Sequence, residues 1–115
     1  MRISLIFISI FISLSFYSQD KSVKTVTINV KGNCDQCKTR IENAADIKGV
    51  KLCVWDEITK LAKIKYDTVK VSLNQIEKAI AKAGHDADLE PASKESYKKL
   101  PKCCQYNDAK CDKPK

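Results

Sequence analysis

The spacing of apolar residues between positions 24 and 90 restricts most strongly how this chain can fold. Residues 24–30 alternate between apolar and polar, which is typical of a half-buried strand with Val26, Ile28 and Val30 on its buried face. From Asp35 the apolar spacing becomes helical, with Lys48-Gly49 as the predicted stop. The predicted buried face of this helix carries Cys37, Ile41, Ala44 and Ala45. Because strands repeat every two residues and helices every 3.6, each change of period marks a new element.

Two further alternating segments, residues 50–55 and 61–66, are predicted strands joined by a hairpin turn at residues 56–60. The side chains expected to point inward are Val50, Leu52 and Val54 in the first strand and Ala62, Ile64 and Tyr66 in the second.

A second helix is predicted after Ser72, which forms a capping-box pattern with Gln75 three residues later. Gly84 supplies a left-handed stop, and a short last strand is expected over residues 87–90. The apolar stripe of this helix consists of Leu73, Ile76, Ala79, Ile80 and Ala83.

This element order predicts an α+β fold, a ferredoxin-like βαββαβ sandwich in which two helices cover one face of a four-stranded antiparallel sheet. The first and third strands would be central, and the loops at 32–35, 56–60 and 84–86 would meet at one end of the sheet. Residues 91–115 are rich in lysine and cysteine and lack a period, so they are predicted to form an irregular Cys-containing C-terminal tail.

The first 19 residues are typical of a secretory signal peptide. A positive charge at Arg2 precedes an apolar run over residues 3–16, which is shorter than the roughly 20 residues a membrane-spanning helix needs. We expect cleavage after Ser18 or Gln19, and export to a periplasm or the cell exterior.

The chain carries a formal net charge of +7 at pH 7, which falls to +6 without Arg2, the one charged residue of the predicted leader. The lysines are scattered rather than arranged in a stripe, so we predict no nucleic-acid partner. The positive charge is expected instead to help docking onto an acidic partner or an anionic membrane surface.

Cys34 and Cys37 lie two residues apart where a predicted strand turns into a predicted helix. The helix amino terminus offers unpaired N–H groups and partial positive charge, which favour the metal-binding thiolate form. Thiolates select soft cations, so Cu(I) is the predicted ligand, with Hg(II) and Zn(II) as alternatives. Structural zinc is disfavoured because it normally takes four protein ligands.

The remaining cysteines leave alternatives open, because six cysteines in a short exported chain also suit a disulfide framework. Cys53 is predicted on the open face of the sheet, where the tail would fold over it and a disulfide to Cys103 or Cys104 would staple it. The alternative is a free Cys53 thiol in a different strand register. Cys103, Cys104 and Cys111 would form a second, weaker metal site or pair among themselves.

Four segments together resemble the heavy-metal-associated domain family: GNCDQC at 32–37, RIENAADIKGV at 40–50, WDEITKLAKIKYD at 55–67 and IEKAIAKAGHDA at 76–87. That family includes copper chaperones, amino-terminal modules of copper-pumping ATPases and periplasmic mercury-binding proteins. The resemblance implies that residues 23–90 form such a domain, and that Cys34 and Cys37 are its two metal-binding cysteines.

At two positions near the cysteines this chain differs from the usual pattern of the family. Gly32 stands where the family usually has a methionine packed beneath the loop. His85, the only histidine, stands where most members have an aromatic residue, although some bacterial copper chaperones resemble this chain in having histidine. His85 is therefore either a third ligand or proton-sensitive gate, or a polar residue that only shields the site.

Taken together, these patterns predict an exported, monomeric metal-binding protein that is not an enzyme. It would carry Cu(I) for transfer, buffering or detoxification, with a metal-transporting membrane protein or a metal-accepting protein as its partner. The alternatives are mercury scavenging, thiol–disulfide exchange and a purely structural disulfide domain.

Overall fold

The computed structural model describes residues 22–107, so the predicted signal peptide at 1–19 and Cys111 lie outside the described residues. The elements follow the predicted order as far as the second helix: β1 (Val23–Asn29), α1 (Asp35–Ala45), β2 (Val50–Trp55), β3 (Leu61–Asp67) and α2 (Leu73–Lys82). Two short helices then follow, α3 (Lys94–Lys98) and the 3-10 helix η1 (Lys102–Cys104). Within residues 22–107, no helix is both long and apolar enough to cross a bilayer.

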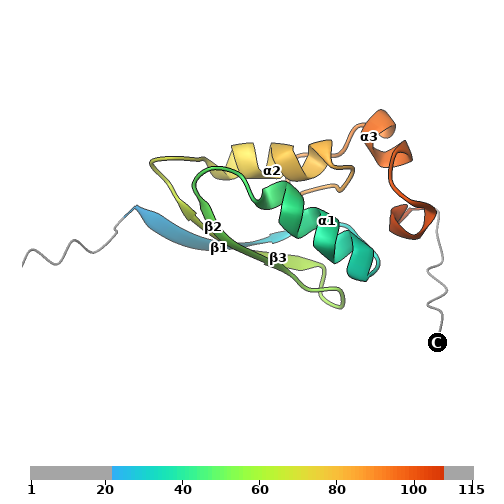
Figure 1. Ribbon diagram of the computed structural model, residues 1–115, viewed down its shortest axis with the longest axis horizontal. Coiled ribbons are helices and arrows are strands. Elements are labelled where there is room, and N and C mark those ends of the chain that lie inside the picture. The colour runs from blue at the N-terminus through green and yellow to red at the C-terminus, as the bar shows by residue number, and fades with distance from the viewer. Residues whose placement is uncertain (1–21, 108–115) are drawn as a thin grey trace, which may run out of the picture.

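The three strands form one antiparallel sheet in the order β1-β3-β2, and α1 and α2 cover one face of it (Figure 1). The described residues contain no fourth strand, so the prediction of a four-stranded sheet was wrong. The segment expected at residues 87–90 contributes only isolated bridges, from Ala87 to Val30 and to Glu90. Only one bridge forms to the first strand because Ala87 also pairs with Glu90, which turns the chain back on itself.

The core lies between the sheet and the two helices. In β1, in Val30 directly after it and in β3, the predicted alternation is confirmed, with Ile28, Val30, Ala62, Ile64 and Tyr66 all buried. From the helices, the core receives Cys37, Ile41, Ala45, Ile76 and Ile80.

The facing of β2 differs from the prediction. Leu52 and Val54 are 49% and 44% exposed, whereas Trp55 is fully buried. The register shifts between Val50 and Leu52, which is a β-bulge. The extra residue reverses which side chains point inward, so Cys53 and Trp55 lie opposite Ile64 and Ala62 of β3 and share their core-facing side.

The helix boundaries follow from local signals. At α2 the capping box is present, since the Ser72 side chain accepts a hydrogen bond from the Gln75 backbone N–H and the Gln75 side chain accepts one from the Ser72 N–H. Gly84 ends this segment with φ +107°, as predicted. α1 ends earlier than expected, at Ala45, and Gly49 with φ +98° directly precedes β2.

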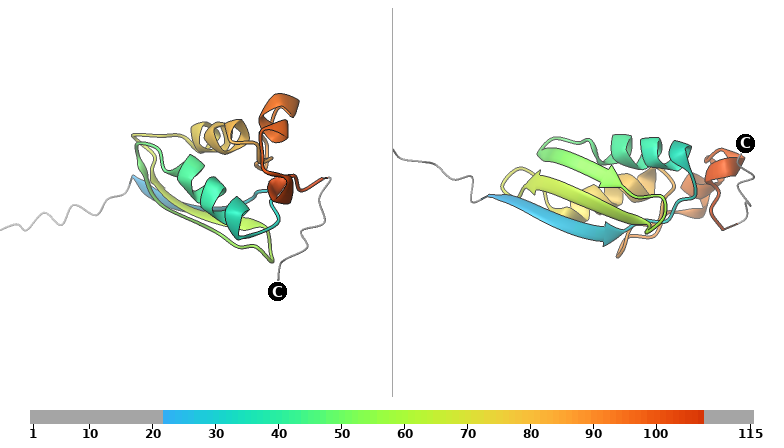
Figure 2. Two further views of the ribbon diagram at one scale, coloured as in Figure 1. Left: turned by 45° about the vertical axis from the view of Figure 1, so that its right-hand side comes forward. Right: turned by 90° about the horizontal axis from the view of Figure 1, so that it is seen from below.

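The tail is more ordered than predicted. Helices α3 and η1 lie at one end of the sandwich, with η1 beside the amino terminus of α1, in each view of the molecule (Figure 2). The predicted covering of the open sheet face by the tail is wrong. The tail instead packs against the loops that precede α1 and follow α2.

Candidate metal centre

Cys34 and Cys37 converge at the amino terminus of α1. Cys34 is the N-cap residue, and its side chain makes no capping hydrogen bond to the helix. The Sγ atoms of the two cysteines are 3.8 Å apart, which is thiol contact rather than the roughly 2.05 Å of a disulfide bond. Cys37 is fully buried and Cys34 is half-buried, so Cys34 is the more exposed residue of the pair.

The loop that carries Cys34 is held by the last turn of the domain. The Lys31 backbone N–H donates to the Asp86 carbonyl at 2.9 Å, and the Val30 N–H donates to the Lys60 carbonyl at 2.9 Å. The three loops predicted to meet at one end of the sheet are therefore neighbours.

Trp55 fills the space beneath this loop. A Cβ atom at Gly32 would lie 2.9 Å from Cζ2 of Trp55, so the indole ring packs directly on the glycine. The ring is anchored because Nε1–H donates to the Val30 carbonyl at 2.9 Å. The indole therefore supports the loop from beneath, and Gly32 is required because a larger residue would meet the ring.

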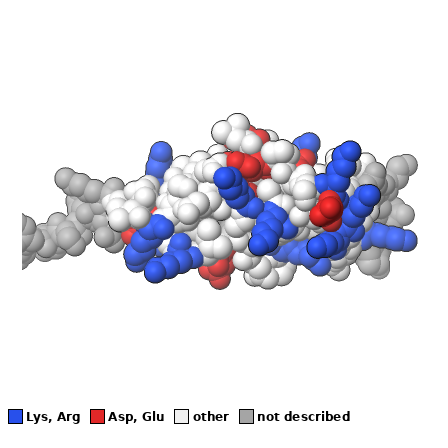
Figure 3. Space-filling view, turned by 90° about the horizontal axis from the view of Figure 1, so that it is seen from above, with Lys and Arg blue, Asp and Glu red and all other residues white. Residues whose placement is uncertain are grey.

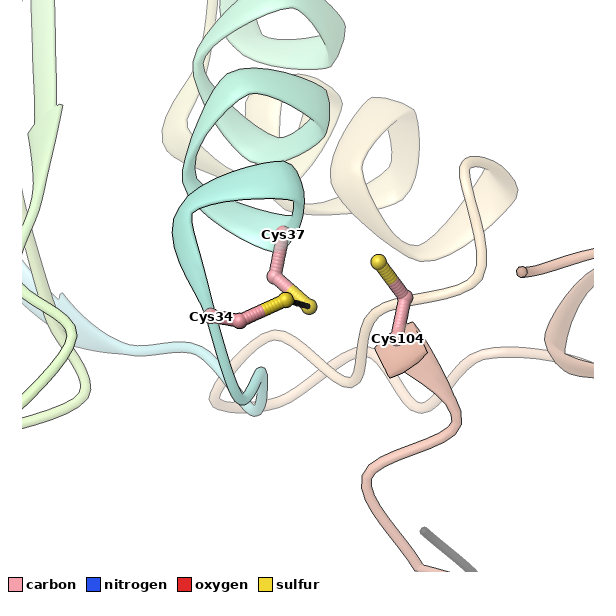
Figure 4. A group of neighbouring side chains, drawn as sticks. All are labelled: Cys34, Cys37 and Cys104. Carbon is pink, nitrogen blue, oxygen red and sulfur yellow. Dashed lines mark hydrogen bonds between the residues drawn. The ribbon is translucent and has the colours of Figure 1, made fainter. Parts of the chain in front are cut away.

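Cys104 joins the two predicted sulfurs. It lies at the end of η1, is fully buried, and points toward Cys34 and Cys37 (Figure 4). The three Sγ atoms all lie within 4.8 Å of one another, which makes the group a possible ligand set for a metal ion. Burial, followed by the neighbouring Cys37 thiol, raises the pKa of Cys104 well above its usual range. In the absence of a cation, Cys104 is therefore a neutral thiol.

The neighbouring tail residue Cys103 contacts the same loop. Its Sγ–H donates to Oε1 of Gln36 at 3.0 Å, and its carbonyl accepts from Nδ2 of Asn33 at 3.4 Å and from the Cys34 thiol at 3.7 Å. These contacts connect residues about 70 positions apart in the sequence. Cys104 thus lies beside Cys34 and Cys37, while a second metal site or a disulfide among Cys103, Cys104 and Cys111 stays a prediction.

His85 is fully buried beside the loop but does not belong to the three-sulfur group. Its Nδ1 is hydrogen-bonded to the Lys31 carbonyl at 2.8 Å, and its ring stacks on Tyr106 at 5.8 Å between centroids. Because a carbonyl can only accept, Nδ1 carries the proton and donates. Burial lowers the pKa of His85, so the ring stays neutral to lower pH than an exposed histidine. Its role as a ligand remains a prediction.

Cys53 was predicted to lie on the open face of the sheet, and this prediction is wrong. The residue faces the core from β2. The bulge described above is the physical reason. Cys53 carries a free thiol, which excludes the predicted disulfide staple and agrees with the alternative of a shifted register. Burial, and then the charge of Glu42, raise the pKa of Cys53 to about 11. A neutral thiol in this position is poorly suited to binding a cation or attacking a disulfide.

Sequence reasoning named Cys104 as a possible disulfide or secondary metal residue but did not place it beside Cys34 and Cys37, because the tail has no long-range period. Local signals for its order were nevertheless present. Ser93 caps α3 by accepting from the Ser96 N–H, and Tyr97 and Leu100 follow at helical spacing. These signals predict a short helix, but they carry no information about the loop on which it packs.

The fold is similar to that of several solved proteins. A CopZ metallochaperone is 30% identical, with the match covering 56% of this chain and 98% of that chain at a TM-score of 0.54. Oxidized MerP from Ralstonia metallidurans CH34 is 29% identical, covering 57% and 94% at a TM-score of 0.55. A copper form of a CopA variant from Bacillus subtilis is 26% identical, covering 59% and 92% at a TM-score of 0.50.

No family model matches the chain, and no curated protein sequence matches it. The similarity to solved structures spans nearly the full length of the metallochaperone and leaves a large part of this chain unmatched.

Proposed function

Because this chain belongs to the heavy-metal-associated domain family, we propose that it captures Cu(I) through Cys34 and Cys37 and passes it to an acceptor. The observation that carries the proposal is the convergence of two sulfurs, 3.8 Å apart, at the amino terminus of an 11-residue helix. Support for copper comes from the softness of thiolate ligands and from the likeness to the copper form of CopA. The protein would act by binding and transfer rather than by catalysis.

The helix terminus supplies the electrostatics for capture. The first turn of α1 has backbone N–H groups without partners inside the helix, and the Cys34 side chain does not cap them. Their partial positive charge stabilises negative charge on sulfur, so the two thiols can lose their protons to an arriving cation. The released protons make capture tighter as pH rises.

The difference in exposure between the two cysteines gives an order of transfer. Cys37 is fully buried and Cys34 is half-buried, so a thiolate of the acceptor reaches the cargo from the Cys34 side. The bond to Cys34 would then be exchanged first and the bond to Cys37 last. Cys53 takes no part, because it faces the core from β2.

The charge of the surface suits an acidic acceptor or membrane surface. Lysine and arginine side chains are spread along the helical face and gather at the end that carries α3 (Figure 3). The exposed lysines of this end include Lys94, Lys98, Lys99 and Lys102. We propose that this end meets a metal-transporting membrane protein or a metal-accepting protein.

Titration of the reduced protein with Cu(I), in competition with a chromophoric chelator, tests the proposal. The wild-type protein should retain one tight equivalent, and both Cys34→Ser and Cys37→Ser should lose it to the chelator, because each removes one sulfur of the pair at the start of α1. Cys53→Ser is the matched control, since it also removes one partly buried thiol but should keep full retention. Retention of Cu(I) by both site variants at the wild-type level would refute the proposal.

Hg(II) is the second candidate cargo, favoured by the likeness to MerP and by the same pair of soft ligands. Metal analysis of protein isolated from its native compartment separates the two, because only one cation should be present in stoichiometric amount. Thiol–disulfide exchange predicts instead disulfide-reductase activity that requires both cysteines while Cu(I) is held poorly.

We also propose that the protein works outside the cytoplasm, on the evidence of the signal-peptide pattern in residues 1–19. When the full chain is produced, the exported fraction should contain a product that begins at Gln19 or Asp20. Intact mass measurement checks this, and a cytoplasmic product that keeps Met1 would contradict it.

A further inference from the structure

We propose that Cys104 is a third ligand of the same centre, so that the tail completes a three-sulfur site around the cation held by Cys34 and Cys37. This inference rests on the proposed function and deepens it. Neither the two-cysteine motif nor the resemblance assigns a role to the tail, which lies beyond the predicted domain at residues 23–90.

The distances between the sulfurs support three-coordinate binding. With metal–sulfur bonds of about 2.3 Å, three sulfurs around one ion lie about 4 Å apart, whereas two sulfurs on opposite sides of an ion lie about 4.6 Å apart. The Sγ atoms of Cys34 and Cys37 are 3.8 Å apart, and that of Cys104 lies within 4.8 Å of both. The pair is therefore spaced for a third ligand, and Cys104 occupies that place.

The position of Cys104 is determined by packing of the tail and does not depend on a cation. Leu100 is 4% exposed and packs on Gly84, where a Cβ atom would lie only 2.7 Å from Leu100 Cγ and 2.8 Å from the Ser96 carbonyl. Gly84 thus allows the tail to approach the end of α2 closely. Because this contact is made before the metal arrives, the third sulfur adds little ordering cost to binding.

A second set of contacts holds the other side of η1. The Tyr106 hydroxyl accepts from the Asp86 N–H and donates to the Gly84 carbonyl, both at 3.1 Å. The Tyr106 ring also stacks on His85, whose Nδ1 is bonded to the Lys31 carbonyl. Contacts on both sides therefore keep Cys104 directed at the loop that carries Cys34.

A third sulfur changes which cations the centre can bind and how readily a bound cation is transferred to an acceptor. Soft cations such as Cu(I) and Hg(II) accept three thiolates, whereas a structural zinc ion would require a fourth ligand. Cys104 also closes the side of the site opposite α1, so an acceptor must compete with three sulfurs instead of two. The tail therefore favours retention of the cargo over rapid release.

Sulfur counting by X-ray absorption spectroscopy on the Cu(I)-loaded protein tests the inference, using protein from cells that express the full chain with Cys111 unchanged. The wild-type protein should show three sulfur neighbours around copper. Cys104→Ser should show two, and its affinity in chelator competition should fall at least about tenfold, because even partners of metal ligands contribute 10- to 100-fold.

Cys103→Ser is the matched control, since it removes the adjacent thiol, which donates to Gln36 and touches Cys104 Sγ at 3.8 Å but does not belong to the group of three sulfurs. It should keep three sulfurs and wild-type affinity. Circular dichroism of the metal-free variants checks folding. If Cys104→Ser does not fold, Cys104→Ala takes its place, and two sulfurs in the wild-type protein would still overturn the inference.

The outcomes separate this inference from the proposed function. Two sulfurs in the loaded wild-type protein would overturn the role of Cys104 while leaving capture by Cys34 and Cys37 intact. Three sulfurs that fall to two in Cys103→Ser would also overturn it, because the third ligand would then be Cys103. A wild-type protein that retains no Cu(I) would refute the function itself.

Discussion

Gly32 and Trp55 share one small space beneath the loop that carries the cysteines. The indole ring is 1% exposed and lies so close to Gly32 that a Cβ atom there would meet it at 2.9 Å. The loop is therefore supported by an aromatic residue from β2. Support of this kind positions a sulfur without contributing a ligand.

Gly32→Met should destabilise the protein by roughly 1–3 kcal/mol, because the added side chain forces the indole out of a filled core. Urea unfolding followed by circular dichroism measures the loss. Repeating the substitution in a Trp55→Leu background gives the matched control, since the smaller side chain leaves room for methionine. An equal loss in both backgrounds would show that the indole is not the obstacle.

Glu77 is an acidic residue whose charged form is destabilised by burial. It lies in α2 and is 2% exposed. Burial, with smaller contributions from the charges of Asp88 and Glu90, raises the pKa of this carboxyl above its ordinary value of 4.5. The folded protein thus holds the Glu77 proton more tightly than the unfolded chain does, and stability from this group is lost as pH rises.

Glu77→Gln should therefore stabilise the protein at pH 7, where the buried carboxylate is charged, and the gain should shrink below about pH 4.5 as the wild-type carboxyl is protonated. The free energy of unfolding in urea at pH 7 and pH 4 provides the comparison. Glu95→Gln, at an exposed position of α3, should change stability little at either pH. A loss of stability at pH 7 for Glu77→Gln would contradict this account.

At the scale of elements, local signals determine where α2 begins and ends, whereas the buried face of β2 depends on its pairing with β3. The helix has a complete capping box at Ser72 and Gln75, and both ends were predictable from a few residues. In β2 the alternation predicted the strand correctly but its facing wrongly. The bulge between Val50 and Leu52 becomes visible only when β2 is paired with β3.

Ser72→Ala should lower the free energy of unfolding by about 1 kcal/mol, because the backbone N–H of Gln75 loses its acceptor at the start of α2. Thermal or urea unfolding measures the change. Ser72→Asp keeps an oxygen acceptor and should remain close to wild type. Equal stability of the alanine and aspartate variants would mean that the cap contributes nothing here.

At the scale of the whole molecule, the tail is part of the folded unit. It buries Leu100 against Gly84 and closes the end of the sandwich where the cysteines lie. The sheet and two helices resemble the solved metallochaperone, and the match to it covers 56% of this chain.

A chain that ends after Ala92 should keep the α+β core but unfold more easily, by about 1.5–3 kcal/mol for the lost burial of Leu100 alone. Its Cys34 and Cys37 thiols should also react faster with an alkylating reagent, because η1 no longer covers them. Leu100→Ala in the full-length chain is the matched comparison, since it should reproduce part of the stability loss while the tail remains. Unchanged alkylation rates in the shortened chain would show that the tail does not cover the site.

The sequence by itself determined the order of elements, the ends of α2 and the convergence of Cys34 with Cys37, because each depends on residues a few positions apart. The tertiary structure alone decided which face of β2 is buried, how Trp55 supports Gly32, and where Cys104 lies. These features depend on strand register and on packing between segments up to about 70 residues apart. Such contacts leave no periodic trace in the chain, because they are selected by the shape and burial of surfaces that exist only after folding.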